Sequence, residues 1–452
     1  MQITFLGGAG TVTGSKYYLD LGSAKMLVDC GLFQGFKNLR LRNWASLPFD
    51  PEKLDAVVLT HAHLDHSGYL PLLVRHGFRG AIYCTPATRD LCNILLPDSG
   101  YLQERDAEAA NRHGYTKHKP ALPLYTQRDA ESALRYFRPI PFDRSQAISG
   151  EVKLRFSVAG HILGAACAQI EGAGISVGFS GDLGRPHDAV MLDPAPMRQT
   201  DYLIVESTYG NRLHDARDSE KALADIVNRT VQRGGSILIP AFAVGRAQTA
   251  LYHLMRLKSA NRIPDLPVFL DSPMAVNASK IFCHHMGEHR LTESECKATC
   301  NVATYIQSVP ESKALGSNAM PKIIVTASGM ATGGRVLHHL KHYAPDRRNT
   351  ILFTGFQAGG TRGAAMTGGA GSVKIHGSYV PVLAEVENLH MLSAHADASE
   401  IIEWLKKFAS PPKTTFITHG EPEASDMLRK RIEEELGWKC MVPEHAEQVR
   451  LQ

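Results

Sequence analysis

The chain has 452 residues, of which 44% are hydrophobic and 21% are charged. This is an ordinary composition for a folded globular protein, and the length favours two or three domains. No apolar stretch is long enough to cross a membrane, and the N-terminus lacks the basic segment and apolar core of a signal peptide. We therefore expect a cytoplasmic protein with no membrane partner.

The eight cysteines and the small net charge of +4 exclude fewer classes of protein. The cysteines show no regular pairing, so they do not predict a disulfide framework, and they agree with a reducing compartment. Cys296 and Cys300 lie near His284, His285 and His289, but the spacing is wrong for a zinc knuckle. The net charge permits an anionic substrate without requiring one.

The N-terminal region predicts antiparallel strands in residues 2–6, 16–21 and 25–28, with a glycine turn at residues 7–10. The third strand ends in Met26-Leu27-Val28 and is followed directly by Asp29. A side chain that follows a buried strand lies at the edge of the sheet, where loops converge. We therefore expect Asp29 beside any site that forms at this edge.

The segment His61-Ala62-His63-Leu64-Asp65-His66 places four possible metal ligands within six residues. The apolar run Ala56-Val57-Val58-Leu59 before it predicts a buried strand, and the apolar periodicity after it predicts a helix that ends at Gly77. The ligands therefore lie in a turn between a strand and a helix. Imidazole and carboxylate groups together suit Zn²⁺, and their clustering favours metal binding over isolated hydrogen-bonded histidines.

One short loop cannot surround two ions, so further ligands must come from other parts of the chain. Three later residues follow apolar runs in the same way, each beside a glycine. They are His161, Asp182 and His419. A lone histidine is more often satisfied by a hydrogen bond in the core, but these positions fit the need for additional ligands.

The middle of the chain predicts an inserted α/β domain. Residues 86–112 read as a helical stretch that Pro97 is expected to interrupt. After residue 209, short apolar runs at 236–240, 267–270, 322–326 and 350–354 alternate with helical stretches. Strands that alternate with helices favour a mostly parallel sheet with helices on both faces.

Loops of this inserted region supply candidate substrate contacts. Glycine allows backbone amides to approach a phosphate closely, and serine or arginine can donate to its oxygens. Similar loops also occur in α/β folds for purely structural reasons. The candidate substrate-binding residues are Ser328, Gly329, Gly359, Gly360, Arg362 and Ser393.

The C-terminal region predicts a return to the first domain. Asp397 and Glu400 form a capping box that starts a helix at residues 398–408, and His395 lies just ahead of it. A last helix over residues 423–436 ends at Gly437. We expect a first domain at residues 1–208, an inserted domain at 209–378, and a second part of the first domain at 379–452.

Together, these motifs resemble the metallo-β-lactamase superfamily, and in particular its β-CASP branch of RNA- and DNA-processing nucleases. The resemblance rests on HxHxDH, a later His, Asp and Glu, a long insertion, Ser393-Ala394-His395-Ala396-Asp397 and Thr418-His419-Gly420-Glu421, and it covers essentially the whole chain. It implies an α/β fold, namely a metallo-β-lactamase αββα sandwich with an inserted β-CASP α/β domain.

The resemblance also implies two Zn²⁺ ions per chain. The first would be held by His61, His63, His161 and Asp182, and the second by Asp65, His66, Asp182 and His419. Asp182 is the natural bridge, because a carboxylate has two oxygens. Asp29 would orient a ligand, and His395 held by Glu206 would protonate the leaving oxygen. The expected catalytic residues are His395, Glu206, Asp29 and Asp65.

The leading hypothesis for function is a zinc-dependent ribonuclease that hydrolyses single-stranded RNA, and the sequence leaves open how the activity divides between endonucleolytic and 5′ to 3′ exonucleolytic cleavage. RNA-active members of the branch carry histidines at the positions of His395 and His419, and this chain has both. The alternatives are a DNA-processing nuclease, a thioester or lactam hydrolase, a diiron oxidoreductase and a non-catalytic RNA-binding subunit. A homo-oligomer is compatible with the sequence.

Overall fold

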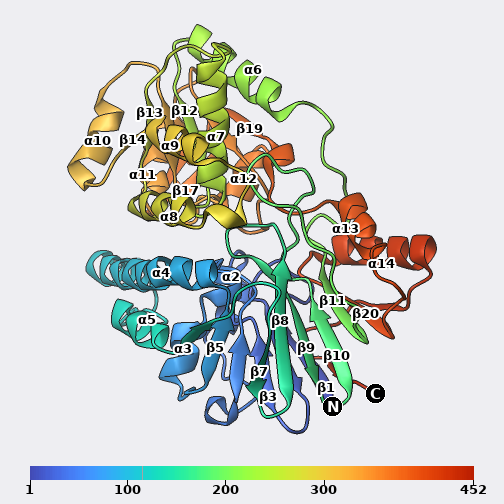
Figure 1. Cartoon of the computed structure of the whole chain (residues 1–452). Coiled ribbons are helices and arrows are strands. Elements are labelled where there is room, and N and C mark those ends of the chain that lie inside the picture. Colours follow the sequence, from blue (N-terminus) through green and yellow to red (C-terminus); the bar gives the residue numbers. More distant parts are fainter. Residues whose placement is uncertain (115) are drawn as a thin grey trace. The chain divides into compact units, whose positions relative to one another are not determined.

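The computed structural model describes residues 1–114 and 116–452. The chain forms two compact units (Figure 1). Unit 1 comprises Met1–Leu213 and His395–Gln452, and unit 2 comprises His214–Ala394. Unit 1 is therefore assembled from both ends of the chain. Within the described ranges, no helix is both long and apolar enough to span a membrane.

Unit 1 contains two seven-stranded sheets. The first has the order β22 (Gln448–Arg450), β1 (Gln2–Gly7), β2 (Lys16–Asp20), β3 (Lys25–Val28), β4 (Ala56–Val58), β5 (Ala81–Cys84) and β6 (Phe137–Pro139). The second has the order β21 (Cys440–Met441), β20 (Thr414–Thr418), β11 (Tyr202–Glu206), β10 (Ile175–Phe179), β9 (Ala166–Gly172), β8 (Val152–Val158) and β7 (Ser145–Ser149).

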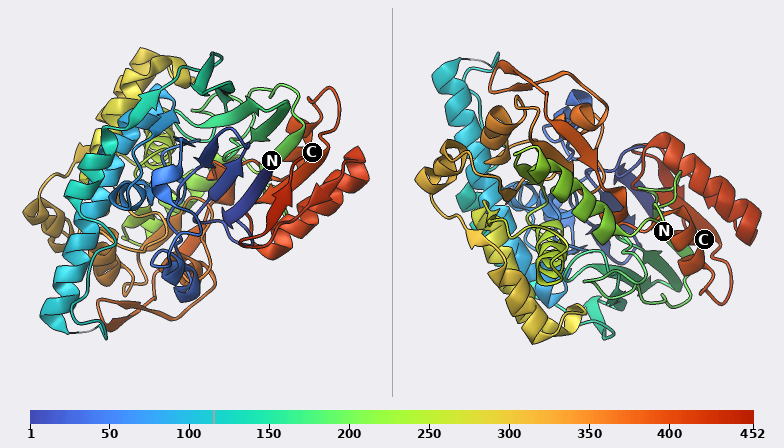
Figure 2. Two further views of the ribbon diagram at one scale, coloured as in Figure 1. Left: turned by 90° about the horizontal axis from the view of Figure 1, so that it is seen from below. Right: turned by 90° about the horizontal axis from the view of Figure 1, so that it is seen from above.

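The two sheets of unit 1 pack face to face through alternating apolar side chains. Phe5 and Val58 of the first sheet share one buried core with Phe156, Phe179 and Phe416 of the second. Helices α3, α4 and α5 lie on one side of the sheets and α13 and α14 on the other (Figures 1 and 2). The expected αββα sandwich is confirmed.

The helices of unit 1 differ greatly in length. They are α1 (Lys37–Arg42), α2 (Leu64–Ser67), α3 (Leu70–Arg75), α4 (Pro86–His113), α5 (Gln127–Leu134), α13 (Ala398–Leu405) and α14 (Pro422–Leu436), with a 3-10 turn at Pro51–Lys53. The expected break at Pro97 is wrong, because α4 continues through it. Leu91 and Leu96 before Pro97, and Ser99 and Gly100 after it, are all buried, so packing holds the helix together across the missing hydrogen bond.

Unit 2 contains a six-stranded parallel sheet in the order β14 (Thr304–Tyr305), β13 (Val268–Leu270), β15 (Ile323–Thr326), β12 (Ile237–Pro240), β16 (Thr350–Phe353) and β19 (Glu385–Asn388). Its helices are α6 (Ser219–Gln232), α7 (Arg246–Ser259), α8 (Pro273–His284), α9 (Glu293–Asn301), α10 (Val309–Ser317), α11 (Val336–Tyr343) and α12 (Arg362–Thr367). Separate apolar cores lie on the two faces of the sheet.

The structure places the second boundary between the units later than residue 379. The hairpin of β17 (Ser372–Ile375) and β18 (Ser378–Pro381) and the edge strand β19 still belong to unit 2. Strand β19 has the sequence Glu-Val-Glu-Asn, which carries little apolar signal. It is held instead by Arg229, which forms ion pairs with Glu385 and Glu387 at 2.6 and 2.5 Å.

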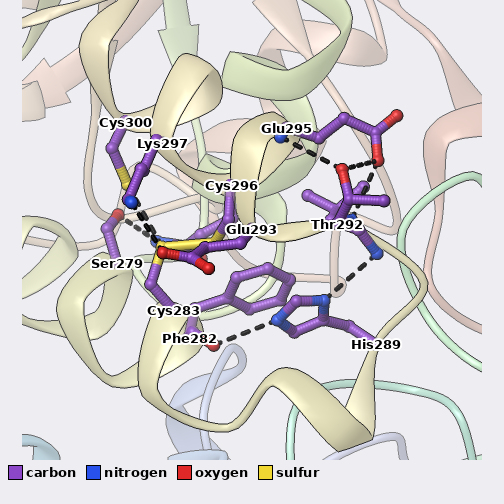
Figure 3. The surroundings of a disulfide bond; sticks show 12 residues. Ser279, Phe282, Cys283, His289, Thr292, Glu293, Glu295, Cys296, Lys297 and Cys300 are labelled. Carbon is purple, nitrogen blue, oxygen red and sulfur yellow. Dashed lines mark hydrogen bonds and ion pairs between the residues drawn. A yellow bond between two sulfur atoms is a disulfide. The ribbon is translucent and has the colours of Figure 1, made fainter.

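A disulfide joins Cys283 at the end of α8 to Cys296 in α9 (Figure 3). The sequence predicted no disulfide framework, and this single pair was not anticipated from it. Six cysteines remain free, and four of these, Cys30, Cys84, Cys92 and Cys167, are buried. The pairing depends on how two helices pack, so the spacing in the sequence did not reveal it.

Candidate metal centre

The strands of unit 1 bring dispersed polar residues to one edge. Strands β3 and β4 run parallel, and so do β10, β11 and β20, so that within each sheet their carboxyl ends lie together. The residues that follow or end these strands are Asp29, the segment His61–His66, Asp182, Glu206 and His419. His161 joins them from the loop after β8.

One group of possible ligands consists of His61, His63, His161 and Asp182, whose donor atoms all lie within 4.8 Å of one another. His63 Nδ1 lies 3.2 Å from both His61 Nε2 and His161 Nε2. Asp182 Oδ2 faces the same group, at 3.4 Å from His61 Nε2 and 3.6 Å from His161 Nε2. Three imidazoles and a carboxylate oxygen thus share one centre.

A second group consists of Asp65, His66 and His419. His66 Nε2 lies 3.0 Å from His419 Nε2, which is 3.6 Å from Asp65 Oδ2. The other oxygen of Asp182, Oδ1, lies 3.2 Å from His66 Nε2. The two oxygens of one buried carboxylate therefore face two separate groups of donors.

The chemistry of these donors fits cations rather than a closed hydrogen-bond network. His66 Nδ1 lies 2.7 Å from Asp29 Oδ2, so that side of the ring is held by a carboxylate and Nε2 faces His419 Nε2 and Asp182. Burial alone would lower the pKa of His66, but Asp182 and Asp29 outweigh burial and raise it, so a bound cation would take the place of a proton on this ring. Zn²⁺ ligands adopt this arrangement, in which imidazole nitrogens and carboxylate oxygens converge at separations of about 3 Å. The residues present therefore fit a metal centre.

Burial sets the protonation of these groups. It lowers the pKa of His63 to about 4 and that of His61 well below the usual range for histidine, so both imidazoles are in the neutral form that binds metals. Burial alone would raise the pKa of Asp182, but His419 and His66 beside it outweigh burial and hold the pKa well below its usual range. The bridging carboxylate is therefore ionised.

Three side chains around the centre orient the candidate ligands. Asp29 lies in the left-handed region at φ 57° and accepts hydrogen bonds from the Thr60 amide and hydroxyl, which fixes its carboxylate against His66. Thr208 Oγ1 lies 3.1 Å from His419 Nδ1. Such partners hold ligand rings in one orientation.

Beside these groups, His395 pairs with Glu206. His395 Nδ1 lies 3.1 Å from both carboxylate oxygens of Glu206. The buried Glu206 also accepts hydrogen bonds from the amides of Leu183 at 2.6 Å and Thr208 at 3.3 Å. The His395 ring centre is 4.4 Å from that of His161. Burial lowers the pKa of His395, but Glu206 outweighs burial and raises it.

The expected substrate-binding residues all lie in unit 2, on loops that contact each other. The Gly363 amide donates to Met330 O, and Gln357 Nε2 donates to Gly329 O. Arg362 donates to the carbonyls of Ala331, Thr332 and Lys374, and so ties these loops to β17. Ser328 Oγ lies 3.0 Å from Thr332 Oγ1. Gly359, Gly360 and Ser393 lie in the same unit.

Sequence reasoning missed Thr60, Thr208 and the Leu183 amide. Thr60 lies directly before the metal-binding segment, and Thr208 lies two residues after Glu206. A hydroxyl next to a candidate ligand was the available signal, but threonine is also common at strand ends. The Leu183 amide carries no signal in the sequence, because any residue except proline provides it.

Comparisons with known protein families agree with this arrangement. The profile of the metallo-β-lactamase superfamily matches residues 10–230, and that of the Beta-Casp domain matches residues 247–366. The profile described as a Zn-dependent metallo-hydrolase RNA specificity domain matches residues 379–443. The three matches cover both units.

Individual relatives extend over the whole chain. A ribonuclease of Thermus thermophilus is 36% identical over 440 residues, which cover 96% of each chain. A transcription termination factor of Methanocaldococcus jannaschii is 32% identical over 440 residues, covering 93% of this chain and 67% of the relative. A solved structure of a protein of unknown function from Enterococcus faecalis shares the fold, with a TM-score of 0.53, 14% identity, and coverage of 100% of this chain and 99% of that one.

Proposed function

The chain belongs to the β-CASP branch of the metallo-β-lactamase superfamily, and on this premise we propose that it is a zinc-dependent ribonuclease with two Zn²⁺ ions per chain. The observation that carries the proposal is Asp182, whose two oxygens face two groups of donors. One group would hold the first ion with His61, His63 and His161. The other would hold the second with Asp65, His66 and His419.

When bound, two zinc ions would acidify a water molecule and stabilise the negative charge that develops on a phosphodiester. The chain's own residues prepare the centre for this. Asp29 and Thr208 hold His66 and His419 in fixed orientations. The neutral state of His61 and His63 lets their ring nitrogens act as ligands at physiological pH.

His395 supplies the proton for the leaving oxygen. Its Nδ1 is held by Glu206, so the other ring nitrogen, Nε2, is the one that can deliver a proton to the reacting bond. Glu206 favours the protonated ring, which a donor needs at neutral pH. His395 is therefore assigned as a proton donor, and Asp29, Thr208 and Glu206 as positioning residues.

The substrate is single-stranded RNA. The relative of T. thermophilus is named a ribonuclease, and the profile matched by residues 379–443 is described as an RNA specificity domain. The loops that carry Ser328, Gly329, Gly359, Gly360, Arg362 and Ser393 would contact its phosphates. A cytoplasmic location is part of the proposal; the four buried free thiols agree with a reducing compartment, whereas the Cys283–Cys296 bond does not.

The test compares RNA and DNA of the same sequence. Freshly purified protein should cut a defined single-stranded RNA much faster than the matched DNA, and it should leave 5′-phosphate and 3′-hydroxyl ends. A chelator should abolish cleavage, and added zinc should restore it. Cyclic phosphate products would contradict the proposal, because they require attack by the 2′-hydroxyl instead of water.

A further inference from the structure

An exposed patch of aromatic and basic side chains surrounds α1 of unit 1. We define the α1 patch as Phe36, Lys37, Arg40, Leu41 and Trp44. The side chains of Phe36, Leu41 and Trp44 are 54%, 53% and 57% exposed, and α1 has no buried residue. A helix with only partly buried side chains gains little from packing, so the exposed aromatic rings beside it are a candidate binding surface.

The cations of the α1 patch lack acidic partners. In the described part of the chain, neither Lys37 nor Arg40 forms an ion pair. Arg42 at the end of α1 stacks over the ring of Phe33, with its guanidinium carbon 5.4 Å from the ring centre. The patch thus combines uncompensated positive charge with open aromatic faces, which are the two features that bind single-stranded nucleic acid.

The α1 patch is tied closely to the metal centre within unit 1. The backbone of Gly31 packs directly against the Asp65 carbonyl, and the Leu32 amide donates to Leu64 O. Asn43 then holds the segment, because its side chain exchanges two hydrogen bonds with the backbone of Phe33. Phe36 follows Gly31 by five residues and so lies at most about 18 Å from it.

We propose that the α1 patch binds single-stranded RNA beside the scissile bond, with bases stacked on Trp44 and Phe36 and phosphates facing Lys37 and Arg40. This inference rests on the proposed ribonuclease function and adds a site for the strand outside the metal centre. The distance between Phe36 and Gly31, which packs against Asp65, is at most about 18 Å and corresponds to a few nucleotides of an extended strand.

The test uses two substrates of different reach. Bis(p-nitrophenyl) phosphate contacts the metal centre alone, whereas a 20-nucleotide RNA also reaches the α1 patch. Trp44→Ala should raise KM for the RNA about 5- to 100-fold, the cost of losing a stacked base, with turnover of the small substrate unchanged. Trp44→Phe should restore most of the affinity. Lys37→Ala and Arg40→Ala should each lower the slope of log affinity against log salt by about 0.7.

A matched control removes an exposed apolar residue and a cation elsewhere in unit 1. Leu122→Ala with Arg128→Ala serves this purpose and should leave KM for the RNA unchanged. An unchanged KM in Trp44→Ala would overturn the α1 proposal while the ribonuclease assignment stands. Hydrolysis of the small substrate without cleavage of any RNA would overturn the ribonuclease assignment itself. A change of molar mass in Trp44→Ala would mean that the patch binds a second copy of the chain instead.

An independent observation concerns three cysteines of unit 2. Cys283 is bonded to Cys296, and its sulfur also lies 3.6 Å from that of Cys300 (Figure 3). Cys296 and Cys300 are four residues apart in α9, so they share one face of the helix. Cys283 and Cys300 are partly exposed. The sulfur of Cys283 is therefore central to the group, in a residue that is only partly buried.

The nearby histidine does not complete a metal site with these sulfurs. His289 stacks on Phe282 with ring centres 4.0 Å apart, accepts a hydrogen bond from the Leu291 amide at Nδ1, and donates from Nε2 to Phe282 O. Both of its ring nitrogens are occupied. The buried thiols elsewhere differ from this group, because burial raises the pKa of Cys30 and Cys167 to about 12 and leaves them unreactive.

We propose that Cys283, Cys296 and Cys300 form a thiol-disulfide exchange site in which Cys283 can bond to either of the other two. A low-molecular-weight disulfide such as oxidised glutathione takes up two electrons and two protons as the first bond forms. In the exchange, the Cys300 thiolate attacks Cys283, the Cys283–Cys296 bond breaks, and Cys296 leaves as a thiolate. The proton lost by Cys300 is balanced by the proton that Cys296 gains.

Peptide mass mapping after equilibration in a glutathione buffer tests this site. Cys300→Ser should retain the Cys283–Cys296 bond, and Cys296→Ser should form a Cys283–Cys300 bond. Cys283→Ser should form neither and serves as the control. Absence of a Cys283–Cys300 bond in Cys296→Ser would overturn the proposal. So would a zinc ion that is lost on Cys283→Ser, since it would show that the three sulfurs bind metal.

Discussion

Two buried carboxylates, one in each unit, have contrasting surroundings. In unit 2, Asp271 is fully buried and accepts hydrogen bonds from Arg335, His339 and Ser312 at 2.6, 2.5 and 2.5 Å. In unit 1, Asp182 is equally buried, but its oxygens lie 3.2 to 3.6 Å from imidazole nitrogens. The first network is complete as it stands. The second has longer separations, which suit the proposed role of Asp182 as a ligand to cations.

The contrast separates a stabilising site from the site that we propose for metal binding. A buried carboxylate that is satisfied by close donors contributes to folding. Metal-ligand atoms that face one another without forming close hydrogen bonds contribute little to the stability of the fold until a cation binds. The free-energy cost of burying them is tolerated because the site has a function. Substitutions at the two aspartates should therefore have opposite consequences, one on chemistry and the other on stability.

The largest effect on phosphodiester turnover is expected for Asp182→Ala. Removing the shared carboxylate opens both groups of donors, so turnover should fall by at least about 10³-fold. Asp65→Ala and His419→Ala should also cripple turnover by opening the second group. Circular dichroism should show an intact fold in each case. Unchanged activity in any of the three would rule out the ligand assignment.

His395→Ala should reduce turnover about 10²- to 10⁴-fold, the usual cost of losing a general acid, with the metal content intact. Glu206→Gln should reduce turnover by a smaller factor, because the imidazole of His395 remains although the carboxylate charge that orients it is gone. Single-turnover kinetics together with metal analysis measure both effects. Loss of zinc in His395→Ala would show instead that this residue is a ligand.

Asp29→Asn should have a smaller effect, a loss of about 10- to 100-fold in activity or metal affinity. The amide keeps the shape of the side chain but weakens its hydrogen bond with His66 Nδ1, which now lies 2.7 Å from a carboxylate oxygen. Titration with a competing chelator measures the affinity. An affinity equal to that of the native protein would argue against an orienting role.

Asp271→Asn should leave hydrolysis of bis(p-nitrophenyl) phosphate unchanged and should destabilise unit 2 by about 3–5 kcal/mol, as expected when a buried charged pair is broken. Burial alone would raise the pKa of Asp271, but the hydrogen bonds from His339, Ser312 and Arg335 outweigh burial and lower it. A lowered pKa in the folded state stabilises the protein at neutral pH, and this stability is lost as the pH falls below the usual value for aspartate.

Denaturant unfolding across a range of acidic pH checks both parts of this prediction. The stability of Asp271→Asn should depend less on pH on the acid side than that of the native protein. Loss of bound zinc in this variant would contradict the separation between the two aspartates.

The residues of the candidate metal centre could be predicted from the sequence as a group because the signals for them are local. Four candidate ligands lie between His61 and His66, and His161, Asp182, Glu206 and His419 each end or follow an apolar run. Other features depend on tertiary contacts. Strand β19 is polar and held by Arg229, α4 continues through Pro97 against a buried core, and the Cys283–Cys296 bond depends on the packing of α8 and α9. Local patterns carry none of this information.

The number of zinc ions per chain tests the central claim most directly. Native mass spectrometry of freshly purified protein should find two zinc ions per chain, and Asp182→Ala should lose both or retain one weakly. Asp271→Asn, measured alongside, should retain two. A native protein with no bound transition metal, or an Asp182→Ala variant that still holds two ions, would contradict the account of Asp182 as the bridging ligand.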